Sequence, residues 1–64
     1  MPTYKFKIGQ SVFIKSARHE NLPGGRYVIL HKMPERDGEF EYRVKNMTEP
    51  HERVVRESQL SVAP

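Results

Sequence analysis

The side chains most able to do chemistry are three histidines, His19, His31 and His51, which fall in three separate segments of the chain. A serine nucleophile needs a base within hydrogen-bond reach, and no pattern here indicates such a pairing. Solvated or packed histidines are the more ordinary interpretation. We therefore predict no catalytic residues, and a protein that is not an enzyme.

Metal and nucleotide binding are also poorly supported. Glu49 and Glu52 flank Pro50-His51 and could hold a hard cation, but a surface loop without function explains them as well. Gly24-Gly25 is followed neither by the lysine of a phosphate-binding loop nor by a helix. We predict no metal and no cofactor.

Basic side chains are concentrated in the first 26 residues, where Glu20 is the only acidic one. Such an excess can contact phosphates if it gathers on one surface. Base stacking would need exposed aromatic rings, and Tyr4 and Phe13 are the ones available. The candidate nucleic-acid contacts are Lys5, Lys7, Lys15, Arg18 and Arg26.

A competing hypothesis is a protein partner or self-association. Phe13, Val28 and Leu30, together with Val55, exceed what one small core can hold. Some of them could form an exposed apolar patch, and an unpaired sheet edge could accept a strand. The candidate partner surface is Phe13, Val28 and Leu30, although curvature of the sheet could bury them instead.

Size and composition limit the chain to a single domain, residues 1–64. A chain of 64 residues with a hydrophobic fraction of 36% has room for one small core. It has no cysteine, so disulfides and thiolate zinc sites are excluded. It also lacks a secretion signal and a run long enough to span a membrane, and we expect a cytoplasmic protein. The net charge of +3 permits nucleic-acid binding without requiring it.

The elements that must position these residues are β-strands, because no window shows helical periodicity. Residues 39–45 alternate polar and apolar without a fault, so Phe40, Tyr42 and Val44 should share a buried face. Residues 26–33 form the partner strand, and Asp37-Gly38 reads as the turn of a hairpin.

Two registers are open for this hairpin. A two-residue turn places Met33 opposite Tyr42, His31 opposite Val44 and Ile29 opposite Asn46. A three-residue loop with Gly38 in a bulge shifts the pairing by one, placing Lys32 opposite Tyr42 and Leu30 opposite Val44. The first aligns more apolar side chains, and we prefer it.

The remaining elements are short. Residues 12–15 form the first strand, and residues 4–8 lead into it, with Phe6, Ile8, Val12 and Ile14 on one face if the chain stays extended. Residues 16–26 form a long loop pinned by Leu22. Residues 53–56 form a strand, residues 57–60 a tight turn that buries Leu60, and residues 61–63 a closing strand.

These elements carry a resemblance to a known plan. The matching segments are Phe6-Lys7-Ile8-Gly9-Gln10-Ser11-Val12, Gly25-Arg26-Tyr27-Val28-Ile29, Tyr42-Arg43-Val44 and Glu57-Ser58-Gln59-Leu60. The pattern resembles SH3-like small barrels of the Tudor and KOW type, and the whole chain also resembles a group of short bacterial proteins. The resemblance implies an all-β, SH3-like barrel of about five antiparallel strands that acts as a small binding or adaptor module. Our first expectation for its partner is another protein, and the alternative is RNA or DNA.

Overall fold

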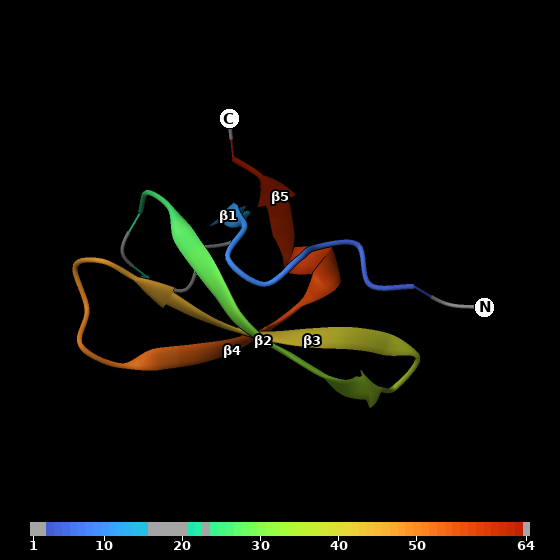
Figure 1. Cartoon of the computed structure of the whole chain (residues 1–64). Coiled ribbons are helices and arrows are strands. Elements are labelled where there is room, and N and C mark those ends of the chain that lie inside the picture. Colours follow the sequence, from blue (N-terminus) through green and yellow to red (C-terminus); the bar gives the residue numbers. More distant parts are fainter. Residues whose placement is uncertain (1–2, 16–20, 23, 64) are drawn as a thin grey trace.

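The computed structural model describes residues 3–15, 21–22 and 24–63. These residues form five antiparallel strands in one sheet, in the spatial order β4-β3-β2-β1-β5 (Figure 1). The strands are β1 (Ser11–Ile14), β2 (Tyr27–Arg36), β3 (Glu39–Asn46), β4 (Glu52–Arg56) and β5 (Leu60–Val62). A single 3-10 turn, η1 (Glu57–Gln59), separates β4 from β5, and the described residues contain no α-helix.

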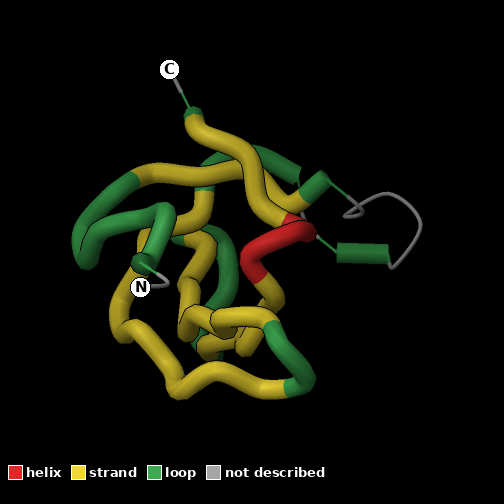
Figure 2. Tube along the Cα trace, turned by 90° about the vertical axis from the view of Figure 1, so that its right-hand side faces the viewer, coloured by secondary structure: helices red, strands yellow, loops and turns green. Residues whose placement is uncertain are grey.

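The all-β prediction is therefore confirmed, whereas a closed barrel is not shown. The sheet curls strongly on itself (Figure 2), but β4 and β5 remain its two edges, with no pairing between them among the described residues. Each predicted strand exists, with ends displaced by up to three residues.

The concave face of the curled sheet holds the core. Its buried side chains come from every strand and from the segment that precedes β1: Phe6, Val12, Ile14, Tyr27, Ile29, Tyr42, Val44, Val55 and Leu60. Tyr4, Leu22 and Phe40 pack against this cluster and are half-buried. The predicted burial of Tyr42, Val44 and Leu60 is confirmed, and the predicted inward position of Leu22 agrees with its packing.

The central hairpin turns as the first register requires. Asp37 and Gly38 both have positive φ angles, 53° and 80°, and Arg36 pairs with Glu39 across this two-residue turn. Both central residues of a type I′ turn need positive φ, which is why an Asp-Gly pair favours it.

Beyond the turn, the predicted register is wrong. Met33 lies opposite Glu41 rather than Tyr42, His31 opposite Arg43 rather than Val44, and Ile29 opposite Val44 rather than Asn46. The cause is two irregularities, one between Met33 and Arg36 and one between Ile29 and His31, each of which adds a residue to β2. The second register is correct in pairing Lys32 with Tyr42, but it is wrong in placing Leu30 opposite Val44 and in its three-residue loop.

The lead-in segment also differs from expectation at one position. Phe6 is fully buried, but Ile8 is 63% exposed and does not share the face of Val12 and Ile14. Gly9 has a φ of 87°, which reverses the chain at that point, and its backbone NH donates to the carbonyl of Ile29. The extended path that would have aligned Ile8 with the core is therefore interrupted.

Candidate functional site

The convex face of the sheet, opposite the core, carries the side chains that alternate with buried ones. Phe13 lies between buried Val12 and Ile14, and Lys45 lies between buried Val44 and Asn46. Val28 lies directly opposite Lys45 on one side and opposite Ser11 on the other. Phe13, Val28 and Lys45 therefore share one face across β1, β2 and β3, and all three are half-buried.

Two further basic residues extend this face at the ends of its strands. Lys15 directly follows β1, and alternation from buried Ile14 turns it outward; its backbone NH donates to Gln59. Arg26 directly precedes β2, and alternation from buried Tyr27 turns it outward as well. Both are exposed. We call Phe13, Lys15, Arg26, Val28 and Lys45 the Phe13 surface.

Elsewhere on the convex face, opposite charges neutralise each other. Arg43 Nη1 lies 3.3 Å from Glu52 Oε1, so Glu52 pairs with Arg43 although Lys45 is its direct cross-strand neighbour. Glu41 lies directly opposite Arg56. Within the part of the chain that the structure describes, Lys15, Arg26 and Lys45 make no ion pair.

The charge of the convex face differs along its length. Toward the hairpin turn the signs alternate, since Arg36 lies directly opposite Glu39 and Arg56 Nη2 lies 4.0 Å from Asp37 Oδ2. At the other end, next to Phe13, Lys15, Arg26 and Lys45 have no ionic partner within the described residues. The unpaired positive charge of this face is therefore found at the Phe13 surface.

The structure brings together only some of the residues singled out from the sequence. Lys15 and Arg26 join Phe13 and Val28, so the nucleic-acid and partner-surface hypotheses converge on one area. Leu30 is half-buried at the bulge in β2. Arg18 and His19 lie outside the described residues.

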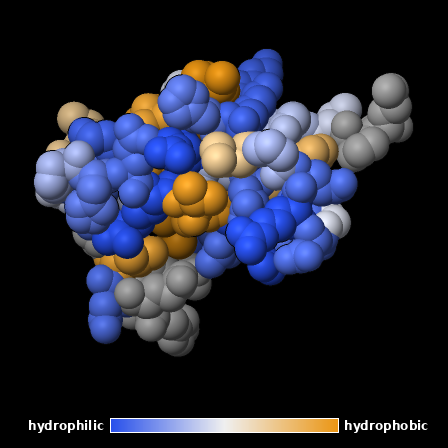
Figure 3. Space-filling view, turned by 90° about the horizontal axis from the view of Figure 1, so that it is seen from below, coloured by the Kyte–Doolittle hydropathy of each residue, from blue (hydrophilic) through white to orange (hydrophobic). Residues whose placement is uncertain are grey.

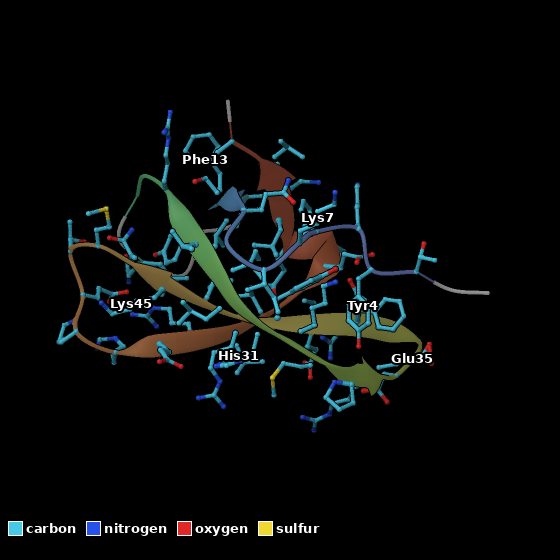
Figure 4. The ribbon with its side chains drawn as sticks, viewed as in Figure 1. Tyr4, Lys7, Phe13, His31, Glu35 and Lys45 are labelled. Atoms are coloured by element: carbon cyan, nitrogen blue, oxygen red, sulfur yellow. The ribbon has the colours of Figure 1, made fainter. Side chains whose placement is uncertain are left out.

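Lys5, Lys7 and Tyr4 belong instead to the segment before β1. The Tyr4 ring stacks on Phe40 with a centroid separation of 4.1 Å, and its hydroxyl donates to the Met33 carbonyl at 2.8 Å, so Tyr4 is a packing residue (Figure 4). Lys45 was missed because its alternation with Glu41 and Arg43 resembles an ordinary solvated face. The signal that identifies it is its position opposite Val28, which local patterning does not contain.

A cluster of hydrogen bonds centred on Tyr42 joins the segment before β1 to β3 and η1. The hydroxyl of Tyr42 donates to Glu57 Oε2, and it accepts from the backbone NH groups of Lys5 at 3.1 Å and Phe6 at 3.3 Å. Burial and the hydrogen bond to Glu57 raise the pKa of Tyr42 to about 12. The group holds the lead-in segment against β3 and η1.

A second polar cluster, centred on Glu49, lies in the connection between β3 and β4. Glu49 accepts two hydrogen bonds from Arg53, at 3.0 and 2.7 Å, and these lower the pKa of the Glu49 carboxyl below its usual value. His51 Nε2 lies 3.2 Å from the same carboxylate. Burial and nearby Glu49 raise the pKa of Tyr27, which lies on the same side of the sheet. This group joins the β3–β4 connection to β4.

Asn46 is the one buried polar side chain among the described residues. Its Nδ2 donates to the Gly24 carbonyl at 3.1 Å, and its Oδ1 accepts from the backbone NH and the hydroxyl of Thr48. The amide therefore connects the end of β3 to the segment that enters β2.

The groups considered for catalysis or metal binding do not converge. Glu49 and Glu52 pair with different arginines, Arg53 and Arg43. His31 lies on β2 opposite Arg43, and His51 pairs with Glu49. Among the described residues, no three histidine or acidic side chains group as metal ligands would, and no pocket is formed.

Comparison with protein-family models, with curated proteins and with solved structures gave no match. Within the described ranges, no helix has the length and apolar character needed to cross a membrane.

Proposed function

We propose that this domain is a non-catalytic binding module built on the SH3-like small-barrel plan. Support for the plan comes from the strand order β4-β3-β2-β1-β5 and from the single 3-10 turn between β4 and β5. The non-catalytic assignment is supported by the spread of the described titratable groups, which are occupied in separate structural contacts rather than directed at a common point.

Nucleic acid is the partner that the geometry supports best. The observation behind this choice is that Lys15, Arg26 and Lys45, the three basic side chains near Phe13, have no ionic partner among the described residues. A surface of one sign attracts a polyanion and gives it a salt-dependent affinity. Arg43 is paired with Glu52 and Arg56 with Asp37, so the attraction centres on Lys15, Arg26 and Lys45.

We now place nucleic acid before a protein partner, the reverse of the order expected from the sequence, because little apolar surface is exposed. Phe13, Val28 and Leu30 are all half-buried, so each exposes only part of its apolar surface to a protein partner. A protein partner or self-association remains the second candidate. It is supported by Val54 and Val62, which are 48% and 60% exposed and belong to the two edge strands. Viewed from below, the molecule is mostly hydrophilic, with apolar patches between the charged side chains (Figure 3).

The test is binding of a fluorescein-labelled 20-nucleotide RNA to the full chain, followed by anisotropy at about 50 mM salt. We expect binding that weakens with salt and that is abolished by Lys15→Glu combined with Arg26→Glu. Arg36→Glu combined with Lys32→Glu changes the net charge by the same amount, but at the hairpin and not at the Phe13 surface. This double variant is the matched control and should reduce affinity much less. Equal losses for the two double variants would contradict the proposal.

The second candidate is tested on the same protein by sedimentation velocity at high concentration. Self-association through the edges predicts a dimer that Val54→Lys or Val62→Lys disrupts. A monomer at all concentrations argues against self-association.

A further inference from the structure

We infer that the Phe13 surface binds single-stranded rather than double-stranded nucleic acid, with a base against the Phe13 ring and phosphates at Lys15, Arg26 and Lys45. The inference rests on the proposed nucleic-acid function and adds to it the strandedness of the ligand and the role of each residue.

The first step is the composition of the surface. Lys15, Arg26 and Lys45 have no ionic partner within the described residues, and the apolar side chains among them are Phe13 and Val28. Single-strand binding sites combine cations that follow the backbone with aromatic faces on which bases stack. Arginine and lysine alone would attract any polyanion, so it is the ring of Phe13 that distinguishes the ligands.

The second step is spacing. Tyr27 on β2 lies opposite Val12 on β1. Because the strands are antiparallel, Arg26 and Phe13 are the next residues in the same direction, and they lie beside each other. Lys45 on β3 lies two strands away from Phe13, about 10 Å at the usual distance between strands. At this separation, cations on the two sides of Phe13 can contact phosphates of one strand while a base lies against the ring. In Figure 4, Phe13 and Lys45 both lie on the side of the molecule away from Tyr4 and Glu35.

The third step concerns a duplex, which could contact the cations through its phosphates but cannot bring a base to Phe13. Duplex bases are stacked inside the helix, and reading them needs an α-helix or a β-ribbon that enters a groove. The described residues contain no α-helix, and Phe13 and Lys45 are half-buried in a curved sheet face rather than raised on a ribbon. A half-buried phenylalanine has no partner on the phosphate exterior of a duplex. The bases of a single strand are free to meet it.

The experiment compares a labelled oligo-dT of eight nucleotides with a labelled duplex of eight base pairs, both titrated with the full chain between about 50 and 200 mM salt. We expect tighter binding of the single strand, with a slope of log Kobs against log salt of about −2 for three phosphate contacts. Phe13→Leu keeps the apolar volume but removes the aromatic face. It should weaken single-strand binding about 5- to 150-fold and leave the salt slope unchanged. Lys45→Gln should reduce the slope by about 0.7.

Controls separate folding from binding. Thermal melting of Phe13→Leu must match the parent within a few degrees; if it does not, Phe13→Tyr, which retains the ring, should bind as the parent does. Arg36→Gln, at the far end of the β2–β3 hairpin, should leave both affinity and slope nearly unchanged.

Each alternative outcome has a distinct meaning. Equal affinity for both oligonucleotides, lost on changing Lys45 but not Phe13, would overturn the inference and leave the proposed nucleic-acid function standing. Absence of binding to either oligonucleotide at 50 mM salt would overturn both. Tighter binding of an acidic peptide such as hexaglutamate, with the same dependence on Lys15, Arg26 and Lys45, would assign the surface to a protein partner.

Discussion

The phenolic hydroxyl of Tyr42 donates a hydrogen bond to the carboxylate of Glu57, and this contact joins the middle of β3 to the 3-10 turn that precedes β5. Because the same hydroxyl accepts from the backbone of Lys5 and Phe6, one side chain connects the lead-in segment, the central hairpin and the last turn. Tyr42 is therefore both a core residue and a polar link.

The two roles of Tyr42 can be separated by mutation. Tyr42→Ala removes a fully buried ring and should cost about 3–5 kcal/mol, enough to unfold much of a domain this small. Tyr42→Phe keeps the ring and loses only the hydrogen bonds, so we expect a smaller cost of about 1–3 kcal/mol. Urea denaturation followed by circular dichroism measures both. A Tyr42→Ala variant that unfolds at the urea concentration of the parent would disprove the assigned burial.

The raised pKa of Tyr42 predicts a loss of stability in alkaline solution. In the unfolded chain, tyrosine ionises near its ordinary value of 10.0, whereas in the folded protein the pKa is about 12. Between these values the folded state binds more protons than the unfolded state, so the free energy of unfolding falls as pH rises from about 10 to 12. Melting temperatures over this range should decline more steeply for the parent than for Tyr42→Phe. Parallel decline of the two would show that other groups are responsible.

Glu49 predicts the opposite dependence in acid. The hydrogen bonds from Arg53 lower its folded pKa below the usual 4.5, so the stabilising contribution is present above that value and is lost as pH falls through the folded pKa. Glu49→Gln should therefore flatten the decline in melting temperature on the acid side of pH 4.5. Glu39 has a lowered pKa from its hydrogen bonds with Ser58, so part of the decline should persist in that variant. His51→Asn serves as the control for the neighbouring imidazole.

Asn46 should be intolerant of truncation. Asn46→Ala removes the hydrogen bonds to the Gly24 carbonyl and the Thr48 backbone NH, and each lost bond should cost about 0.5–1.5 kcal/mol. Met47 is adjacent and 90% exposed, so Met47→Ala should change the free energy of unfolding by less than about 0.5 kcal/mol. Equal effects at the two positions would contradict the structural role given to the amide.

The hairpin turn can be tested at Gly38. With a φ of 80°, Gly38→Ala places a Cβ in the left-handed region and should cost about 1–2 kcal/mol. Gly24 is the matched control, because no positive φ is found there and an added Cβ would meet no atom within 4 Å. Gly24→Ala should therefore be close to neutral. Thermal melting of the two variants decides the question.

Local patterning was sufficient for much of the fold. The alternation through Phe40, Tyr42 and Val44, the Asp-Gly turn and the burial of Leu60 all follow from side-chain period and turn chemistry, which act over a few residues. The register of the hairpin did not follow, because it depends on two extra residues in β2. Pro34 marks the one between Met33 and Arg36, since proline within a sheet is confined to edges and bulges, but the one at Leu30 has no clear sequence signature. Ile8 was misplaced because a glycine permits either an extended path or a reversal, and the backbone contact between Gly9 and Ile29 decides between them.

The candidate site was harder to predict than the fold. Phe13, Lys15 and Arg26 were recognised separately, as parts of two competing hypotheses. Their union depends on which strands are neighbours, since β1 lies between β5 and β2. The contribution of Lys45 depends on the pairing of Glu52 with Arg43, a choice made by side chains in three dimensions.

The pairing of β1 with β5 also bears on how fast this domain folds. Val12 lies opposite Val62 and Ile14 opposite Leu60, so one edge of β1 is satisfied only by residues far along the chain. The central hairpin can form between neighbouring segments, but Ile14 has no cover until β5 reaches it. Such sequence-distant contacts slow folding, so we expect the β1–β5 ladder to form later than the hairpin.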